Sequence, residues 1–251
     1  MDQSNINNYI ENEVDFYKRI ETYFNKSTGT FTEKLHAFPR FVPRQSISYF
    51  LARNEIFKSI INTQGSVLDF GIYRASSFFT WVQLSSIYEP YNHLRKIIGF
   101  DSFNGFSRIG EEDFSNADIN LKRENGMMFP DGQIEIEENI RLIDKNRPLG
   151  HINKSKLIIG DINNTAQQYF DSHPETIVAL ANIGLGLYNP TTSVLEAIKG
   201  RLHKGSVLVF EDLNQENWPG ETRALFNIFE LNKFRLHRVP YCPHISWMTL
   251  E

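Results

Sequence analysis

Five short apolar runs, separated by segments of helical periodicity, constrain the fold of this chain more than any other feature. Helical patterns follow the first run over residues 76–87 and the fourth over residues 191–202. Continuous β-branched runs that alternate with helices are typical of strands buried on both faces of a parallel sheet. The pattern therefore predicts an α/β fold with a mostly parallel sheet and helices on both faces. The five runs are SVLDFG (from Ser66), KIIGFD (from Lys96), KLIIGD (from Lys156), TIVALANI (from Thr176) and SVLVF (from Ser206).

The two ends of the chain depart from this alternation. Near the C-terminus, residues 234–239 and 244–250 are strand-like and are joined by a connection too short for a crossover helix, so an antiparallel hairpin is predicted. At the N-terminus, residues 7–24 and 46–62 carry apolar residues at helical spacing. We predict a helical extension over residues 1–62, followed by a ligand-binding α/β domain over residues 63–251.

One insertion interrupts the domain. The stretch between Asp101 and Asp161 is longer than one crossover helix requires, and its first part is polar and contains Gly110 and Gly126. A lid over the site and a simple surface excursion are both open interpretations. Long excursions at the carboxyl side of parallel strands often carry function, which favours a lid-like insertion over about residues 107–153.

Composition excludes several classes of partner. The 251 residues have a net charge of −4 and no basic block, which argues against nucleic-acid binding. The single cysteine, Cys242, allows no internal disulfide and indicates a reducing compartment. The start of the chain is polar and acidic, and no apolar run approaches the roughly 20 residues that span a bilayer. We therefore expect a cytoplasmic protein with no membrane partner; the apolar stripe of the first helix either covers the site or forms a homodimer.

Acidic residues follow the strand-like runs at Asp69, Asp101, Asp161 and the pair Glu211-Asp212. The carboxyl ends of parallel strands meet at one edge of the sheet, where open α/β sheets bind their ligands. A single acid in such a position usually caps a helix, but several at one edge favour a binding site. The turn after the first strand reads D-F-G-I-Y-R-A-S-S and lacks the G-x-G-x-x-G and GK[ST] patterns. This disfavours a pyrophosphate ligand and a nicotinamide-dependent oxidoreductase.

The same residues suit an adenosine joined to an amino acid. Asp69 would meet the ammonium group of the amino acid, and Gly71 would let the ligand approach the backbone closely because it has no Cβ. Asp101 would accept hydrogen bonds from both ribose hydroxyls. Asp161 would accept a hydrogen bond from the adenine amine.

These motifs resemble the macrocin O-methyltransferase (TylF-type) family of S-adenosylmethionine-dependent enzymes, which methylate sugar hydroxyls of natural products. The resemblance spans about residues 43–220 and rests on VLDFGIYRASS (from Val67), IIGFDSFNGF (from Ile97), IGLGLYNPT (from Ile183) and VLVFEDLNQENWPGETRA (from Val207). It implies a Rossmann-like class I methyltransferase fold with S-adenosylmethionine as cofactor. The cofactor contacts that it implies are Asp69, Gly71, Tyr73, Ser77, Asp101, Ser102, Phe103 and Asp161.

The chain departs from the family at its metal site. Members carry I-D-x-D-x-Y after the fourth strand, and its first aspartate joins two acids after the fifth strand in holding Mg²⁺. Both aspartates are glycine in this sequence, Gly184 and Gly186, whereas Glu211 and Asp212 match the other two ligands. Mg²⁺ takes one or two carboxylates with waters and substrate. Two alternatives stay open: Mg²⁺ held by Glu211 and Asp212 with reduced affinity, or no metal.

The catalytic base is open for the same reason, since a sugar hydroxyl needs a base or a metal before it can act as a nucleophile. The candidates are Asp212 and Glu211 acting directly, or a histidine such as His203, His237 or His244, of which His244 comes first for testing. An acceptor that loses its proton more readily is a further alternative. The sequence predicts a methyltransferase, most simply an O-methyltransferase, for a small hydroxylated natural product or sugar. The rival is a non-catalytic or metal-independent cofactor-binding homologue.

Overall fold

The structure is a computed structural model that describes residues 3–106, 109–115, 125–126, 128 and 132–251. The chain divides into two compact units, Met1–Ile47 and Ser48–Glu251. The remaining positions, which include much of the first part of the predicted insertion, lie outside the described residues.

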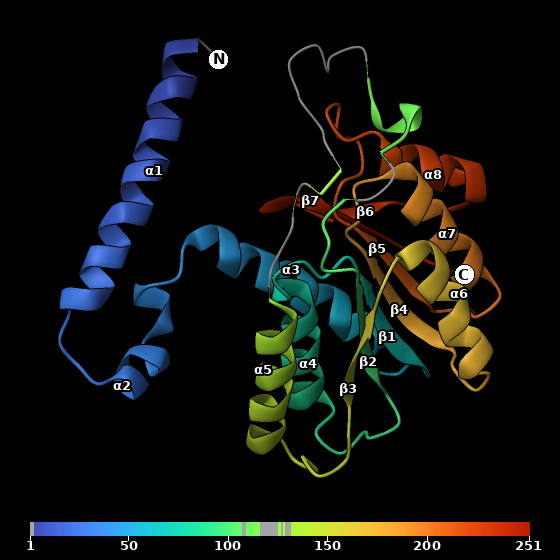
Figure 1. Cartoon of the computed structure of the whole chain (residues 1–251), viewed down its shortest axis with the longest axis horizontal. Helices are drawn as coiled ribbons and strands as arrows, with labels where there is room; N and C mark the ends of the chain where they lie inside the picture. The colour runs from blue at the N-terminus through green and yellow to red at the C-terminus, as the bar shows by residue number, and fades with distance from the viewer. Residues whose placement is uncertain (1–2, 107–108, 116–124, 127, 129–131) are drawn as a thin grey trace. The chain divides into compact units, whose positions relative to one another are not determined.

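One seven-stranded sheet organises the second unit, with the strand order β3-β2-β1-β4-β5-β7-β6 (Figure 1). Strands β1 to β5 pair in parallel, β7 pairs antiparallel with β5, and β6 pairs antiparallel with β7. The predicted mostly parallel sheet with a C-terminal hairpin is thereby confirmed. Strand order reverses between β1 and β4. The strands are β1 (Ser66–Phe70), β2 (Ile97–Asp101), β3 (Ser155–Ile159), β4 (Val178–Ile183), β5 (Val207–Phe210), β6 (His237–Val239) and β7 (Cys242–Thr249).

Helices cover both faces of this sheet, because β1, β4 and β5 are mostly apolar and are buried along their whole lengths. Helices α3, α4 and α5 pack into the core on one face, and α6, α7 and α8 pack into the core on the other. None of the helices in the described ranges combines the length and apolar character needed to cross a bilayer. The helices are α3 (Arg44–Ile60), α4 (Ser76–Tyr88), α5 (Gln133–Asn146), α6 (Ile162–Ser172), α7 (Tyr188–Lys199) and α8 (Gly220–Ile228).

The first unit contains α1 (Gln3–Lys26) and α2 (Phe31–His36), followed by a 3-10 turn at Phe38–Arg40. Helix α1 forms where the helical spacing predicts it. A capping box starts α2: the Thr30 hydroxyl accepts a hydrogen bond from the backbone of Glu33, whose carboxylate accepts one from the backbone of Thr30.

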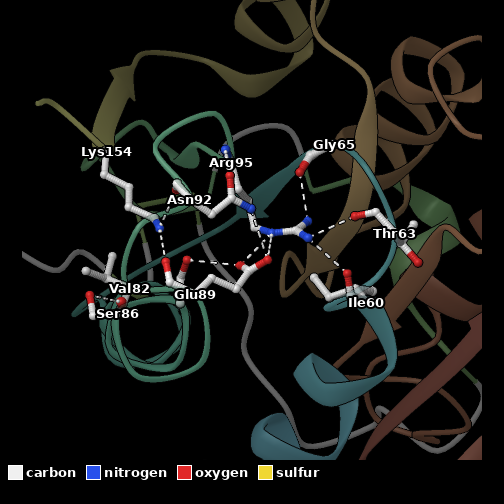
Figure 2. Close-up of polar contacts among 10 residues, drawn as sticks. Ile60, Thr63, Gly65, Val82, Ser86, Glu89, Asn92, Arg95 and Lys154 are labelled. Atoms are coloured by element: carbon white, nitrogen blue, oxygen red, sulfur yellow. Dashed lines mark hydrogen bonds and ion pairs between the residues drawn. The ribbon is translucent and has the colours of Figure 1, made fainter. Parts of the chain in front are cut away.

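A buried ion pair fixes the connections at the amino ends of the strands (Figure 2). Arg95 is 3% exposed, and its Nε donates to both carboxylate oxygens of Glu89, at 2.7 and 3.0 Å. Its remaining nitrogens donate to the carbonyls of Ile60, Thr63 and Gly65, each within 2.9 Å. The side chain therefore ties the end of α3 and the start of β1 to the connection between α4 and β2.

Candidate active site

A cavity of about 390 Å³ lies at the carboxyl ends of the parallel strands, around the point where strand order reverses. Open α/β sheets bind their ligands at such switch points. Apolar side chains from the loops after β2 and β4 form much of its wall, among them Phe106 and Leu185. The predicted site residues that line it are Gly71, Tyr73, Asp101, Ser102, Asp161 and Asp212.

Close backbone contact between the turns after β1 and β4 shapes the floor of the cavity. Gly71 has a φ of +83°, and a Cβ there would overlap the carbonyl oxygen of Gly184. Only glycine meets both demands, because L side chains rarely adopt this φ and no space exists for one. The sequence predicted that Gly71 lets a ligand approach the backbone closely. The structure shows a second reason for glycine, because the backbone of Gly184 leaves no room for a side chain at this position.

Asp101 joins the loops after β1 and β2. Its Oδ2 accepts a hydrogen bond from the backbone N–H of Tyr73 at 2.8 Å, and its Oδ1 accepts one from that of Phe103 at 2.8 Å. Both donor residues have positive φ, 50° and 54°, so the two loops curl tightly around the carboxylate. Burial raises the pKa of Asp101, and these backbone donors oppose that rise. The carboxylate also lines the cavity, where it can accept hydrogen bonds from ligand hydroxyls.

Ser102 and Asp161 extend the same wall. Asp161 is the N-cap of α6, and its Oδ1 accepts a hydrogen bond from the backbone N–H of Asn163 at 3.0 Å. It therefore caps a helix and lines the cavity at once. Phe103 is 6% exposed and contributes its backbone N–H to Asp101, although its side chain belongs to the core.

Asp69 and Ser77 lie in the interior of the domain and are not among the residues that line the cavity. Asp69 is the penultimate residue of β1, and its side chain points to the face covered by α3 and α4, where Asn182 Nδ2 donates to Oδ1 at 2.7 Å. Burial, together with the negative charge of Glu211, raises the pKa of Asp69 to about 7, while bonds from Ser77 and Asn182 lower it. A fully buried carboxylate in this position contacts protein groups, which differs from the predicted contact with a ligand ammonium.

Asp212 faces the cavity from the loop after β5. Gly186 lies opposite, with a φ of +65°, and a Cβ there would lie 3.5 Å from Asp212 Oδ2. The missing side chain therefore leaves this carboxylate open to the cavity. The rings of Phe106 and Trp218, 5.5 Å apart between centroids, line the space beside it. Burial, and then the charge of Glu211, raises the pKa of Asp212 to about 6, so it is mostly ionised at neutral pH and suited to accept a proton.

Glu221 holds the loops that present Asp212, and sequence reasoning missed it. Its side chain is fully buried in the first turn of α8. Oε1 accepts the backbone N–H groups of Glu211 and Asp212 at 3.1 and 3.0 Å, and Oε2 accepts that of Gly186 at 3.3 Å. Burial raises the pKa of Glu221 well above its ordinary value. An acid in a first helical turn is usually exposed, so nothing in the sequence marked this one.

Of the candidate histidines, His244 lies near Asp212. Gln215 Nε2 lies 2.7 Å from His244 Nδ1 and donates to Asp212 Oδ1 at 3.4 Å, so the amide links the two side chains. His244 itself is exposed and is not among the lining residues. The ring nitrogens of His203 lie 2.8 Å from the backbone carbonyls of Lys204 and Gln64. His237 stacks on Trp247 of β7.

The predicted metal site does not fit a divalent cation. Oε1 of Glu211 accepts hydrogen bonds from Arg53 Nη2 at 2.7 Å and from Asn182 Nδ2 at 3.0 Å, so the carboxylate is already paired with a cation. Gly184 and Gly186 supply no ligand atom from their side chains. Among the described residues, no group of three or more His, Cys, Asp or Glu side chains is arranged to hold a metal. Asp212 remains as one carboxylate open to the cavity.

Within the insertion, α5 packs into the core beside α3 and α4, whereas the segment around Glu112 and Asp113 is fixed beside the start of α7 and α8. The 3-10 turn η2 (Glu111–Asp113) places the buried Asp113, whose Oδ1 accepts the backbone N–H of Tyr188 at 2.6 Å. Arg223 of α8 donates to the carbonyl of Glu112 at 2.6 Å. A lid over residues 107–153 stays a prediction, because residues 107–108, 116–124, 127 and 129–131 lie outside the described part.

Solved structures with the same architecture are methyltransferases. No protein-family model matches the chain, and no curated protein sequence matches it. A structure of CalS11, a calicheamicin methyltransferase, matches with a TM-score of 0.86 at 28% identity, over 95% of this chain and 92% of that one. The apo structure of CalS11, described as TDP-rhamnose 3′-O-methyltransferase, matches with a TM-score of 0.81 at 28% identity, over 95% and 94%. The O-methyltransferase NovP shares the fold, with a TM-score of 0.60 at 16% identity over 79% of each chain.

The strand order, the cavity at the switch point and the similarity to CalS11 define the class. The chain is an S-adenosylmethionine-dependent methyltransferase with a Rossmann-like fold. The similarity supports O-methylation as its type of reaction.

Proposed function

We propose that this chain transfers a methyl group from S-adenosylmethionine to a hydroxyl group of a sugar, either free, nucleotide-linked or part of a natural product. CalS11, which is described as a TDP-rhamnose 3′-O-methyltransferase, supports this choice of acceptor. We also propose membership of the macrocin O-methyltransferase (TylF-type) family, on the sequence motifs around Gly71, Asp101 and Tyr188.

One observation carries the proposal: Asp101 and Asp212 line the same cavity from the ends of β2 and β5. These strands are separated by β1 and β4, hence by three strand spacings of about 4.8 Å, or roughly 14 Å. This span suits an adenosine joined to an amino acid with an acceptor beyond it. A carboxylate for the ribose then lies at one end, and a carboxylate for the acceptor lies at the other.

The chain's own groups would position the reactants and move one proton. S-adenosylmethionine, when bound, supplies an electrophilic methyl group. Asp101 would hold the ribose hydroxyls, Asp161 the adenine amine, and the bare backbone at Gly71 and Gly184 would allow close approach. Asp212 would accept the proton of the acceptor hydroxyl as its oxygen attacks in line. The walls of the cavity would exclude water and hold this alignment, which supplies much of the acceleration in such displacements.

The small-molecule acceptor, the homodimer and the cytoplasmic location remain predictions. The side chains of Val14, Phe16 and Tyr17 on α1 are 51%, 41% and 48% exposed, which leaves an apolar stripe available for a second copy. Sedimentation equilibrium of the full chain would measure the oligomeric state.

The test combines binding with turnover. Calorimetry should show that wild type binds S-adenosylhomocysteine. Release of S-adenosylhomocysteine from S-adenosylmethionine should then be measured against TDP-rhamnose, other TDP-sugars and glycosides. Asp212→Asn should keep the affinity for S-adenosylhomocysteine and lose turnover, whereas Asp171→Asn, the same change at an exposed residue of α6 outside the cavity, should keep both.

Two outcomes would contradict the proposal. Failure to bind S-adenosylhomocysteine would remove the cofactor assignment. Binding of S-adenosylhomocysteine with no turnover on all acceptors tested would favour the non-catalytic homologue. Gly184 and Gly186, which replace two aspartates of the resembled family, support that alternative. Turnover that survives Asp212→Asn would exclude this carboxylate as the base while leaving the methyltransferase assignment intact.

A further inference from the structure

We infer that Arg53 supplies the positive charge beside Glu211 that a divalent cation supplies in a metal-dependent methyltransferase, and that methyl transfer by this chain needs no metal ion. The inference rests on the proposed function for its second part. Its first part concerns charge and geometry alone and can be tested without an acceptor.

Arg53 is a buried cation that forms an ion pair with Glu211. The residue lies in α3 and is 3% exposed. Its Nη2 donates to Glu211 Oε1 at 2.7 Å, its guanidinium carbon lies 5.4 Å from the centre of the Tyr49 ring, and the charge of Asp69 also acts on it. A buried guanidinium requires a partner carboxylate, because removing one member of such a pair leaves an uncompensated charge in the interior. Glu211 is therefore held by Arg53 and is not free to bind a metal.

Gly184 occupies the position where the resembled family carries a further metal ligand, and it has no side chain. A Cβ built on Gly184 lies 3.4 Å from the carboxyl carbon of Glu211 and 3.6 Å from the backbone oxygen of Gly71, both ordinary contact distances. Gly184 has no left-handed φ, so an aspartate fits there without backbone strain. A carboxylate at this position would face Glu211 directly. The backbone thus has room for a Cβ at Gly184, and the cation beside Glu211 is Arg53.

This arrangement leaves Asp212 to act alone. Glu211 is paired with Arg53, and Glu221 is occupied by three backbone N–H groups. A dication placed beside Glu211 would meet the guanidinium, and like charges at such range in a partly buried site repel strongly. Asp212 is open to the cavity because Gly186 has no side chain. Within the described part of the chain, it is the acid of this group that lines the cavity and forms no ion pair. Direct proton transfer to Asp212 replaces acidification of the acceptor by a metal.

The experiment measures Mn²⁺ binding by electron paramagnetic resonance and Mg²⁺ effects on thermal melting, with full-length protein saturated with S-adenosylhomocysteine. Wild type should show no saturable Mn²⁺ binding at millimolar concentrations. The double variant Arg53→Met with Gly184→Asp should bind Mn²⁺ at least about tenfold more tightly than wild type, because a positive charge is removed and a carboxylate is added. Mg²⁺ should also raise its melting temperature. The matched control, Arg53→Lys with Gly184→Asp, keeps the positive charge and should bind Mn²⁺ less tightly than the first double variant.

Saturable Mn²⁺ binding by wild type would overturn the inference, and so would equal Mn²⁺ affinity in the two double variants. The wild-type measurement needs no variant to fold. Once an acceptor is known, turnover of wild type should be unchanged by EDTA, and a loss that Mg²⁺ restores would also overturn the inference. Failure of S-adenosylhomocysteine to bind would instead count against the proposed function, so the two failures are distinguishable.

Discussion

Replacing Asp101 by asparagine should weaken cofactor binding far more than its small change in shape suggests. The carboxylate uses both oxygens on backbone N–H groups, Oδ2 on Tyr73 and Oδ1 on Phe103, each at 2.8 Å. Asparagine has one acceptor oxygen, so in either orientation its NH₂ group faces one of these donors. The lost hydrogen bond costs about 0.5–1.5 kcal/mol, which should appear as a lower free energy of unfolding.

The ligand should lose at least one charge-assisted hydrogen bond from the ribose, worth about 1.5–3 kcal/mol. S-adenosylhomocysteine should therefore bind roughly 10- to 100-fold more weakly to Asp101→Asn by calorimetry. Asp171→Asn is the control: Asp171 is an exposed residue of α6 that does not line the cavity, so the affinity should change by less than about threefold. Equal affinities of a folded Asp101→Asn variant and wild type would refute the assignment of Asp101.

Three further predictions follow from the same geometry. Gly71→Ala should abolish S-adenosylhomocysteine binding and lower the melting temperature, because its Cβ overlaps the carbonyl of Gly184; Gly200→Ala, where a Cβ meets nothing within 4 Å, should change neither. Arg95→Met should lower the free energy of unfolding by about 3–5 kcal/mol in urea titrations, since it removes the ion-pair partner of the buried Glu89. Arg141→Met, whose side chain is 65% exposed, should cost at most about 1 kcal/mol. Turnover should rise with pH through about 6 and then level off, because the base must be ionised and the pKa of Asp212 is about 6; a rate that does not change between pH 5 and 8 would exclude it.

The sheet could be predicted from the sequence because its central strands are apolar on both faces. Runs such as that of β4 leave no polar face, which only a parallel sheet between two helical layers accommodates. The C-terminal hairpin could be predicted for a geometric reason, since so short a connection cannot carry a crossover. The acidic residues at the strand ends also predicted a binding site at one edge of the sheet. Asp101, Asp161 and Asp212 line one cavity there.

The position of Asp69 could not be predicted from the rule that acids at strand ends meet at one edge of the sheet. Asp101 is the last residue of β2, but Asp69 is followed in β1 by Phe70. In the register of the sheet Asp69 pairs with Gly99, two residues before Asp101, so its side chain lies in the interior before the strand reaches the cavity. The pairing of Arg53 with Glu211 could not be predicted, because it joins positions 158 residues apart. Arg53 lies in a segment whose pattern predicted only a helix, and Glu221 lies in a motif from which no role for its side chain was inferred.

A crystal structure of the full chain with S-adenosylhomocysteine tests the central claim most directly. The ribose hydroxyls should lie within hydrogen-bond distance of the Asp101 carboxylate, with the sulfur directed along the cavity toward Asp212. A ligand bound elsewhere, or one in this cavity with its sulfur directed away from Asp212, would contradict the account.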